Sequence, residues 1–345
     1  MENLSIILPV YNIEISKIDR CFKSIYSQIG ESDEIIFVDD GSKEEIASFL
    51  DTLQRNNVYI FHQNNSGVSI ARNNGLNHAK NDWIMFIDPD DYLKEDTLNN
   101  LRRYLKTNND IYIFDYYATF DEKNIFKYNF FRTNEITKED IYRNLLDDHY
   151  YINGKDCIIG CGVPWAHIYK KSFIENNQLS FDPNCIRQQD NIFNMYATSK
   201  TDKIELVHYA FYIYCAEHCM TYFKQFKRKS LEYLPYLSEL KTNFYLNEST
   251  SENILRNLVR VNYSSLQLLL STYILNKDVK DSKEDKKKYL LYLKNFEPFK
   301  MVWKYKKYIS FKSRIILFLY KTNQLWILRM FKRLKRCIKI ILRKK

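Results

Sequence analysis

The sequence predicts an α/β fold with a mostly parallel central sheet flanked by helices, followed by a helical C-terminal region. Two observations support this fold class. Over the first 115 residues, short apolar runs alternate with stretches of helical spacing, which is typical of a parallel sheet covered by helices on both faces. From Lys229 to about Lys277, leucines and other apolar residues recur every three to four positions, which indicates helices without further strands.

Each element of the first region follows from its local pattern. Apolar runs predict strands over Leu4–Val10, Glu34–Val38, Val58–Phe61, Trp83–Ile87 and Ile111–Phe114. Between them we expect helices over Ile15–Ile29, from a cap at Ser42 to about Asn56, from Val68 to Lys80 and over Lys94–Lys106. Residues 120–222 are less regular and contain two predicted helices, Lys138–Asp147 and Asn191–Ser199. The charged run Asp278–Lys288 is interpreted as a solvated linker.

A functional site is expected at the strand ends, because ligands of open α/β sheets bind beyond the carboxyl ends of the strands. The most informative end is Asp88-Pro89-Asp90-Asp91, where a buried strand leads into three carboxylates. Repulsion between close carboxylates is relieved by a cation or by solvent. The pattern is therefore compatible with a divalent metal held against a diphosphate, or with a plain acidic turn.

Charge is divided unevenly along the chain. The formal net charge is +10, but residues 277–345 hold 23 Lys and Arg against 5 Asp and Glu, a net of +18, while residues 1–276 have a net of −8. No acidic residue follows Glu297. Such asymmetry indicates an anionic partner for the C-terminal part, either a membrane surface or nucleic acid.

Composition and cysteine usage narrow the class further. A hydrophobic content of 45% with few glycines and prolines excludes disordered and fibrous classes. Seven cysteines without a signal peptide suggest reduced thiols in the cytoplasm. Zinc is conceivable at Cys157/Cys161 and Cys215/Cys219, but zinc sites favour tighter pairs. No apolar run approaches the roughly 20 residues of a transmembrane helix.

Five motifs occur in a fixed order. They are Leu8-Pro9-Val10-Tyr11-Asn12, Val38-Asp39-Asp40-Gly41-Ser42, the run from Gln63 to Gly75, Phe86-Ile87-Asp88-Pro89-Asp90-Asp91, and Pro164–Phe173. In this order and spacing the set closely resembles the family 2 glycosyltransferases, whose nucleotide-sugar-binding fold is called GT-A. The resemblance covers roughly residues 3–222 and implies a GT-A-like catalytic domain.

The resemblance implies a nucleotide-sugar donor, with UDP as the expected nucleotide. It assigns nucleotide-sugar binding to Pro9, Tyr11, Asn12, Asp39, Arg72 and Asp88. Asp88 and Asp90 match the family's Asp-x-Asp, with Asp90 assigned to a divalent cation, Mn²⁺ or Mg²⁺. Such a cation would neutralise charge on the departing UDP. Other interpretations stay open: Asp39 as an acidic turn residue, Tyr11 as a packing aromatic, Arg72 as a structural salt-bridge partner, and Asp91 as a helix cap.

Inverting transfer needs a carboxylate that deprotonates the acceptor hydroxyl. The family places this base in a Glu-Asp pair about 20 residues after its Trp segment. Here that place holds Gln189-Asp190, so Asp190 is kept as the expected base while Gln189 replaces the usual Glu. The alternative role of Asp190 is a helix N-cap.

Two further residues, Trp165 and His218, each have a functional and a structural interpretation. Trp165 marks the acceptor side of the family, where it could stack on a sugar or simply fill the core. His218 could complete the metal site or contact the diphosphate, or it could be an ordinary histidine. The basic residues of the commoner family pattern are missing around it.

Residues 325–345 read as a basic amphipathic helix, with apolar residues every three to four positions and Lys or Arg between them. This pattern is typical of a helix lying in an anionic membrane surface. A helix docked on the body is the alternative, and no recognition motif supports nucleic acid. We expect a catalytic domain over 1–222, a helical accessory region over 223–297 and a membrane-associating tail over 298–345.

The expected function is metal-dependent, inverting transfer of a hexosyl or N-acetylhexosaminyl group to a glycan or lipid-linked acceptor. The expected context is capsule, exopolysaccharide or lipooligosaccharide synthesis, at the inner face of the bacterial cell membrane. One alternative is a catalytically inactive, membrane-associated assembly protein, supported by Gln189 and the unusual His218 segment. A nucleotidyltransferase is another, but the loop after the first strand lacks its glycines.

Overall fold

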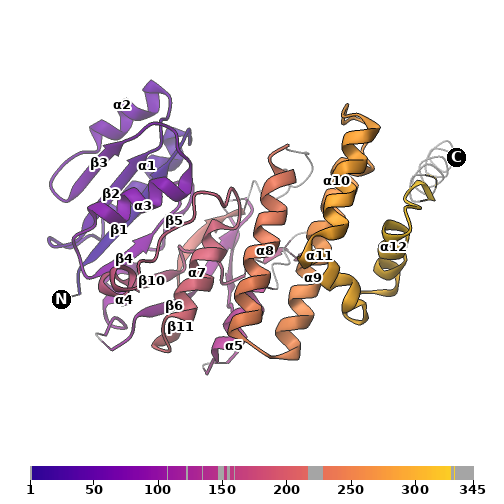
Figure 1. Ribbon diagram of the computed structural model, residues 1–345. Helices are drawn as coiled ribbons and strands as arrows, with labels where there is room; N and C mark the ends of the chain where they lie inside the picture. The colour runs from indigo at the N-terminus through magenta and orange to yellow at the C-terminus, as the bar shows by residue number, and fades with distance from the viewer. Residues whose placement is uncertain are drawn as a thin grey trace, which may run out of the picture. The chain divides into compact units, whose positions relative to one another are not determined.

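A computed structural model describes residues 2–106, 108–121, 123–133, 135–146, 151–153, 156–158, 160–216, 228–327 and 330. The chain divides into two compact units, Met1–Phe223 and Lys224–Lys345. Figure 1 shows a sheet with covering helices in the first unit and helices in the second.

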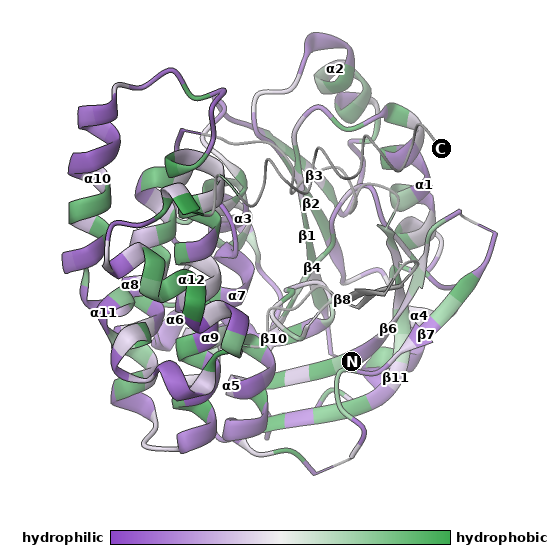
Figure 2. Cartoon of the chain, turned by 90° about the vertical axis from the view of Figure 1, so that its right-hand side faces the viewer, coloured by the Kyte–Doolittle hydropathy of each residue, from purple (hydrophilic) through white to green (hydrophobic). Residues whose placement is uncertain are grey.

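The first unit is built around one curled sheet. Its strands are β1 (Leu4–Val10), β2 (Glu34–Asp39), β3 (Val58–His62), β4 (Trp83–Phe86), β5 (Tyr92–Leu93), β6 (Ile111–Thr119), β7 (Ile125–Tyr128), β10 (His167–Lys170) and β11 (Ile204–Cys215). Their order is β3-β2-β1-β4-β10-β6-β11-β5, with β7 beside β6. A separate hairpin joins β8 (Tyr151–Asn153) to β9 (Asp156–Ile158). In Figure 2, β6, β7 and β11 sweep away from the plane of the first four strands.

Seven helices occur among the described residues of this unit. They are α1 (Ile15–Tyr26), α2 (Glu44–Thr52), α3 (Val68–His78), α4 (Thr97–Arg102), α5 (Lys138–Leu146), α6 (Lys171–Asn176) and α7 (Gln189–Ser199). The prediction of strands alternating with helices is confirmed from β1 to β4, all of which pair in parallel. Beyond β4 the sheet is mixed, because β10 enters antiparallel between β4 and β6.

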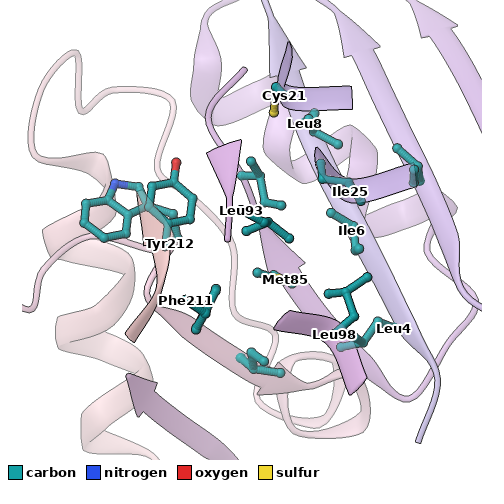
Figure 3. Packing of buried hydrophobic residues seen from close by; sticks show 14 of the residues in the cluster. Leu4, Ile6, Leu8, Cys21, Ile25, Met85, Leu93, Leu98, Phe211 and Tyr212 are labelled. Atoms are coloured by element: carbon teal, nitrogen blue, oxygen red, sulfur yellow. The ribbon is translucent and has the colours of Figure 1, made fainter. Parts of the chain in front are cut away.

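The core lies between β1, β4 and the helix α1. Alternate residues of β1 (Leu4, Ile6 and Leu8) are fully buried, as are Cys21 and Ile25 of α1. Figure 3 shows these side chains gathered between strand and helix. Every second side chain of the strand and every third or fourth side chain of the helix point into the same core. This matching of apolar faces packs a helix onto a parallel sheet.

Three expectations of local structure were wrong. Helix α2 begins after Lys43, not at a Ser42 cap, because the Ser42 hydroxyl accepts from the Asn12 N–H instead. Helix α4 is shorter than Lys94–Lys106 because β5 uses Tyr92 and Leu93, and the Lys94 N–H donates to the sheet at Phe211. The charged run is exposed as expected, but from Lys283 it is the start of α10 and not a linker, since the Ser282 hydroxyl caps this helix by accepting from the Asp285 N–H.

The second unit is helical in its described residues. It contains α8 (Ser230–Glu248), α9 (Glu252–Leu269), a π-helical turn (Leu270–Ile274), α10 (Lys283–Asn295), α11 (Glu297–Lys304), a 3₁₀ turn (Lys306–Tyr308) and α12 (Phe311–Lys321). Within the part of the chain that the structure describes, no helix has the length and apolar content needed to span a bilayer.

Candidate functional site

The ends of three neighbouring strands form the candidate site. The order β2-β1-β4 places the loops after Asp39, Val10 and Phe86 at one edge, because all three strands run in parallel. We call the segments Tyr11–Asn12 and Asp40–Lys43 the loop pair. We call the group of Arg72, Asp88 and Asp190 the arginine bridge.

Asn12 links the two segments of the loop pair by hydrogen bonds. Its backbone is left-handed, with φ 51°. Its N–H donates to the Ser42 hydroxyl at 3.1 Å, and its side-chain oxygen accepts from the Lys43 N–H at 3.0 Å. Asparagine tolerates this conformation better than most residues. The side chain therefore shapes the loops through contacts inside the protein.

Asp39 is buried at the end of β2. One oxygen accepts from the Ser42 N–H at 2.9 Å, and the other lies 2.8 Å from His62 Nδ1. His62 Nε2 lies 3.0 Å from Asp51. The hydrogen bond with Asp39 is the main reason that the pKa of His62 is raised, and Asp51 adds to it. Asp39 thus organises a turn and holds a titratable ring beside it.

Asp40 has a role that sequence reasoning missed, although the motif containing it was recognised. Its carboxylate accepts from Gln63 Nε2 at 2.8 Å, from the Ser66 N–H at 2.7 Å and from the Gly67 N–H at 2.8 Å. These donors precede α3, and Gly67 has φ 94°, which favours glycine. Asp40 therefore fixes the entry of the helix that carries Arg72.

Pro9 and Tyr11 lie on either side of the strand end. Pro9 is buried within β1, next to Val38, at a position beyond the pairing with β4. Proline has no N–H to donate, and because Pro9 lies beyond the pairing with β4, the sheet loses no hydrogen bond on that side. Tyr11 is 51% exposed. It presents a ring to solvent at the edge where the strands end.

Arg72 is the centre of the arginine bridge. It is only 2% exposed, yet it binds carboxylates from two separate elements. Nη2 donates to Asp88 Oδ1 at 2.9 Å, and Nη1 donates to Asp190 Oδ1. The guanidinium also lies 5.2 Å from the centre of the Phe181 ring. A buried arginine with two such partners ties α7 to the end of β4 through charge-assisted hydrogen bonds.

Gly75 explains how Arg72 comes to be buried. A Cβ at this position would collide with the Ile7 side chain of β1. The absence of that atom lets α3 approach the sheet closely, and Ala71, Arg72 and Gly75 share its buried side. The guanidinium is thereby carried beneath the helix, toward the acids at the strand end.

Asp190 lies in the first turn of α7 and does not cap it. The residue at the cap position is Gln188, with φ 59° and no side-chain cap bond. Burial raises the pKa of Asp190 to about 6, while Arg72 acts to lower it and Asp88 adds to the rise. The neighbouring Gln189 Oε1 is buried and finds no hydrogen-bond partner among the described residues. An uncharged side chain there avoids the cost of burying a second carboxylate beside Asp190.

The three acids after β4 have different environments. Asp88 and Asp90 are partly exposed, whereas Asp91 is buried. Asp91 is not a helix cap, because its oxygens accept from Tyr212 Oη at 2.6 Å and from the Cys215 N–H at 2.7 Å. Burial raises the pKa of Asp91 well above its usual range, and the charges of Asp90 and Asp88 add to the rise. Asp91 is a structural acid that anchors the loop to β11.

Arg20 and Tyr212 also support this loop, and no local sequence signal pointed to either. Arg20 of α1 donates to the Asp90 carbonyl oxygen at 2.8 Å, with its guanidinium 4.7 Å from the centre of the Tyr92 ring. Tyr212 Oη accepts from the Asp88 N–H at 3.2 Å while donating to Asp91. Both contacts join segments far apart in the chain, so only the fold reveals them.

Trp165 is buried, and its ring stacks on Tyr212 at a centroid distance of 4.3 Å and an interplanar angle of 8°. Tyr214 stacks on it as well, at 5.6 Å. In this structure Trp165 supports the tyrosine that holds the acidic loop.

His218, the expected further metal ligand, lies outside the described residues. Among the described residues, no three His, Cys, Asp or Glu side chains are arranged to hold a metal ion. Asp88 and Asp90 nevertheless offer two partly exposed carboxylates on one loop. That donor set fits a hard divalent cation that takes its remaining ligands from a diphosphate.

The first part of the chain is similar in sequence to known glycosyltransferases. Residues 5–175 match the sequence model of Glycosyl transferase family 2. The chain is 26% identical over 220 residues to the uncharacterized glycosyltransferase EpsJ of Bacillus subtilis, covering 61% of this chain and 60% of the relative. It is 27% identical over 218 residues to glycosyltransferase GlyA of Streptococcus pneumoniae, covering 62% of this chain and 30% of the relative.

A third relative is the poly(ribitol-phosphate) beta-N-acetylglucosaminyltransferase TarP of Staphylococcus aureus. It is 26% identical over 200 residues, with 56% of this chain and 57% of the relative covered. The chain thus spans between 30% and 60% of the length of these three relatives.

Solved structures show the same fold. S. aureus TarS 1-349 matches with a TM-score of 0.63 at 19% identity, covering 97% of this chain and 91% of that one. The same fragment in complex with UDP-GlcNAc matches with a TM-score of 0.63 at 17% identity, covering 97% and 92%. The fold is accordingly GT-A-like, as the sequence predicted. Through residues 5–175, the chain belongs to glycosyl transferase family 2.

Proposed function

We propose that this chain transfers one sugar, with inversion, from a UDP-linked donor to a glycan or lipid-linked acceptor in bacterial surface-polysaccharide synthesis. The observation that carries the proposal is the arginine bridge. It brings an aspartate from the start of α7 next to an aspartate at the end of β4. The acceptor hydroxyl beside Asp190 and the sugar donor beside Asp88 would meet at this point.

The donor proposal is supported by the composition of the site edge. Tyr11 offers an exposed ring on which a nucleobase can stack. The loop pair, which contains Tyr11, is held by internal hydrogen bonds and so gives the nucleotide a preformed surface. TarS is described in complexes with UDP and with UDP-GlcNAc. UDP-N-acetylglucosamine is therefore the first donor to test.

Asp190 is proposed as the general base. Arg72 occupies Oδ1, and no described residue forms a hydrogen bond with Oδ2, which is available to an acceptor hydroxyl. As Asp190 takes the hydroxyl proton, the acceptor oxygen attacks the anomeric carbon from the face opposite the diphosphate. The bond from that carbon to the diphosphate oxygen breaks, and UDP leaves with the electron pair. Because the pKa of Asp190 is about 6, the base is mostly ionised at neutral pH.

Asp88 and Asp90 are the residues that would hold a Mn²⁺ or Mg²⁺ ion. When bound, the ion would supply charge neutralisation at the diphosphate oxygens. Arg72 and Arg20 shape this loop from the protein side. Arg72 binds the Asp88 carboxylate, and Arg20 binds the Asp90 carbonyl.

The proposed acceptor context is the inner face of the cell membrane. Relatives of this chain include TarP, whose name describes transfer of N-acetylglucosamine to poly(ribitol-phosphate). The excess of basic residues after Glu297 supports attraction to an anionic surface. Segment 325–345, the proposed anchor, lies mostly outside the described residues.

The test is release of UDP from a panel of UDP-sugars with Mn²⁺ present, with and without glycan acceptors. Wild type should turn over at least one donor, and Asp90→Ala and Asp190→Asn should each lower the rate by about a hundredfold or more. Asp202→Asn, an exposed carboxylate paired with Lys138, serves as the control. The acidic limb of the wild-type pH profile should lie near pH 6. If no donor is bound or turned over, the inactive assembly protein becomes the better account.

A further inference from the structure

Helix α12 (Phe311–Lys321) is apolar on two opposite sides. Leu317 and Tyr320 are buried on one side of the helix, and Leu319 is buried at its flank, next to Ile315. On the other side, the α12 row, which we define as Phe311, Ile315 and Phe318, is 77%, 46% and 51% exposed. These residues are spaced four and three apart, so they lie one above the other along the helix. Surface helices normally place polar residues on this side.

Basic side chains border the α12 row. Each residue advances about 100° around a helix, which follows from 3.6 residues per turn. Arg314 and Lys321 therefore lie along one edge of the row, and Lys312 lies along the other. All three are exposed. The Arg314 guanidinium donates to the backbone carbonyls of residues 306, 307 and 309, so no carboxylate neutralises its charge there.

The chain around α12 is also apolar and lacks acidic residues. Trp326 and Met330, which follow α12, are also exposed apolar residues. No acidic residue occurs anywhere after Glu297. Figure 2 shows green, hydrophobic segments along α12. An exposed apolar row with basic edges and no acids is the composition of a helix that lies in a lipid headgroup region.

We propose that the α12 row is a docking surface for an anionic lipid bilayer. Phe311, Ile315 and Phe318 would enter the boundary between headgroups and acyl chains. Lys312 would keep its charged end at the level of the lipid phosphates. Arg314, held by three backbone carbonyls, and Lys321, whose Nζ lies 4.0 Å from the centre of the Trp303 ring, would add fixed positive charge beside the row. The inference rests on the membrane location proposed above and names the surface within 298–345 that would make the contact, and it does not depend on the transfer reaction.

A bilayer suits this surface better than a second copy of the chain. Two copies meeting row to row would bring the same basic edges together, and like charges at an interface disfavour association. A lipid surface with phosphatidylglycerol supplies the opposite charge instead. The lipid phosphates would also be attracted at long range, which makes the interaction sensitive to salt.

The experiment is flotation of the full-length protein with phosphatidylcholine vesicles, with and without phosphatidylglycerol, in the absence of any sugar donor. Ile315→Ser with Phe318→Ser should weaken binding to the anionic vesicles by about tenfold or more. The matched control is Leu246→Ser with Leu268→Ser, two residues of α8 and α9 that are 50% and 39% exposed. It should bind as wild type does.

Two further measurements keep the result interpretable. Lys312→Glu, which leaves the apolar row intact, should weaken binding to the anionic vesicles and leave the weak binding to neutral ones unchanged. Thermal unfolding and UDP release in solution should be unchanged in all three variants, so a failure of the proposed sugar transfer would be seen separately. Equal vesicle binding by the row variant and its control would overturn the proposal. So would a row variant that changes only the oligomeric state in sedimentation.

Discussion

The loop pair and the arginine bridge are built on different physical principles. In the loop pair and the adjoining Asp39, the side-chain oxygens of Asn12, Asp39 and Asp40 accept hydrogen bonds from nearby backbone N–H groups. In the arginine bridge, acids from different elements meet one buried guanidinium. Local backbone geometry thus holds the loop pair together, whereas attraction between buried charges holds the arginine bridge together. We therefore expect the loop pair to affect donor binding and the bridge to affect catalysis and pH dependence.

The largest effect is expected at Arg72. Arg72→Met leaves two acids without their cation, and breaking a buried ion pair costs about 3–5 kcal/mol of unfolding free energy. Because Arg72 lowers the pKa of Asp190, its loss should move the acidic limb of the rate profile to higher pH. Arg72→Lys should move it less, since the charge remains while the two-pronged geometry is lost. Unfolding curves and pH profiles of both variants measure this.

The control for this prediction is Arg102→Met. Arg102 forms an ion pair with the buried Asp33, away from the arginine bridge. That variant should lose stability without any movement of the acidic limb. A similar shift in both variants would mean that the limb reports general destabilisation and not the base.

Asp40 should show the next largest effect, of a different kind. Asp40→Asn replaces an acceptor oxygen with an NH₂ group that faces backbone donors, so about 1–3 kcal/mol of stability is expected to be lost. The loop before α3 would loosen, raising KM for the donor several-fold while kcat changes little. Asp121→Asn is the matched control, because Asp121 also accepts two backbone N–H groups but lies in an exposed turn. A fall in kcat alone would contradict the assignment.

Tyr11 should have a smaller effect, limited to donor affinity. A stacked ring contributes about 0.5–1.5 kcal/mol, so Tyr11→Ala should weaken UDP binding by up to about tenfold. Tyr11→Phe keeps the ring and should bind as wild type does. Calorimetric titration with UDP is the measurement, and Phe126→Ala, at another exposed aromatic residue of the first unit, controls for general effects. Equal affinity in Tyr11→Ala and wild type would place the nucleobase elsewhere.

The smallest expected effect belongs to His62. Its pKa is raised by Asp39 and Asp51, so its stabilising contribution is present below the unfolded-state pKa of about 6.5. That contribution is lost as the pH rises through the folded-state pKa. His62→Gln should remove this part of the pH dependence, with an effect below about 1 kcal/mol because the side chain is partly exposed. Unfolding at pH 5.5 and 8, compared between variant and wild type, checks the sign.

Sequence reasoning reached the parts of the fold that depend on local pattern. The alternation of β1 to β4 with helices follows from apolar runs of strand length and from helical spacing, and both are local properties. The antiparallel entry of β10 depends on pairing across the chain, with Ile168 beside Met85 and Tyr112. No local pattern encodes such a choice, so the mixed half of the sheet was not foreseen.

The same division applies to the candidate site. Recognisable motifs named Arg72, Asp88 and Asp190, and the structure brings these three together. The parts that were missed act through distant partners: Arg20 on the carbonyl of Asp90, and Tyr212 on Asp91. The interpretation of Asp91 as a cap, which the sequence left open, was wrong for the same reason: a carboxylate before a helix has the same local pattern whether its partner is near or far in sequence.

Gly75 links the packing of α3 against β1 to the pKa of Asp190. The missing methyl group against Ile7 sets how deep α3 lies, and the depth of α3 sets how well water is kept from the guanidinium one turn earlier. A residue that touches neither acid can consequently tune the proton affinity of Asp190. Natural or engineered variation at this helix–strand contact offers a way to shift the proton affinity of Asp190 while every polar group of the site stays the same.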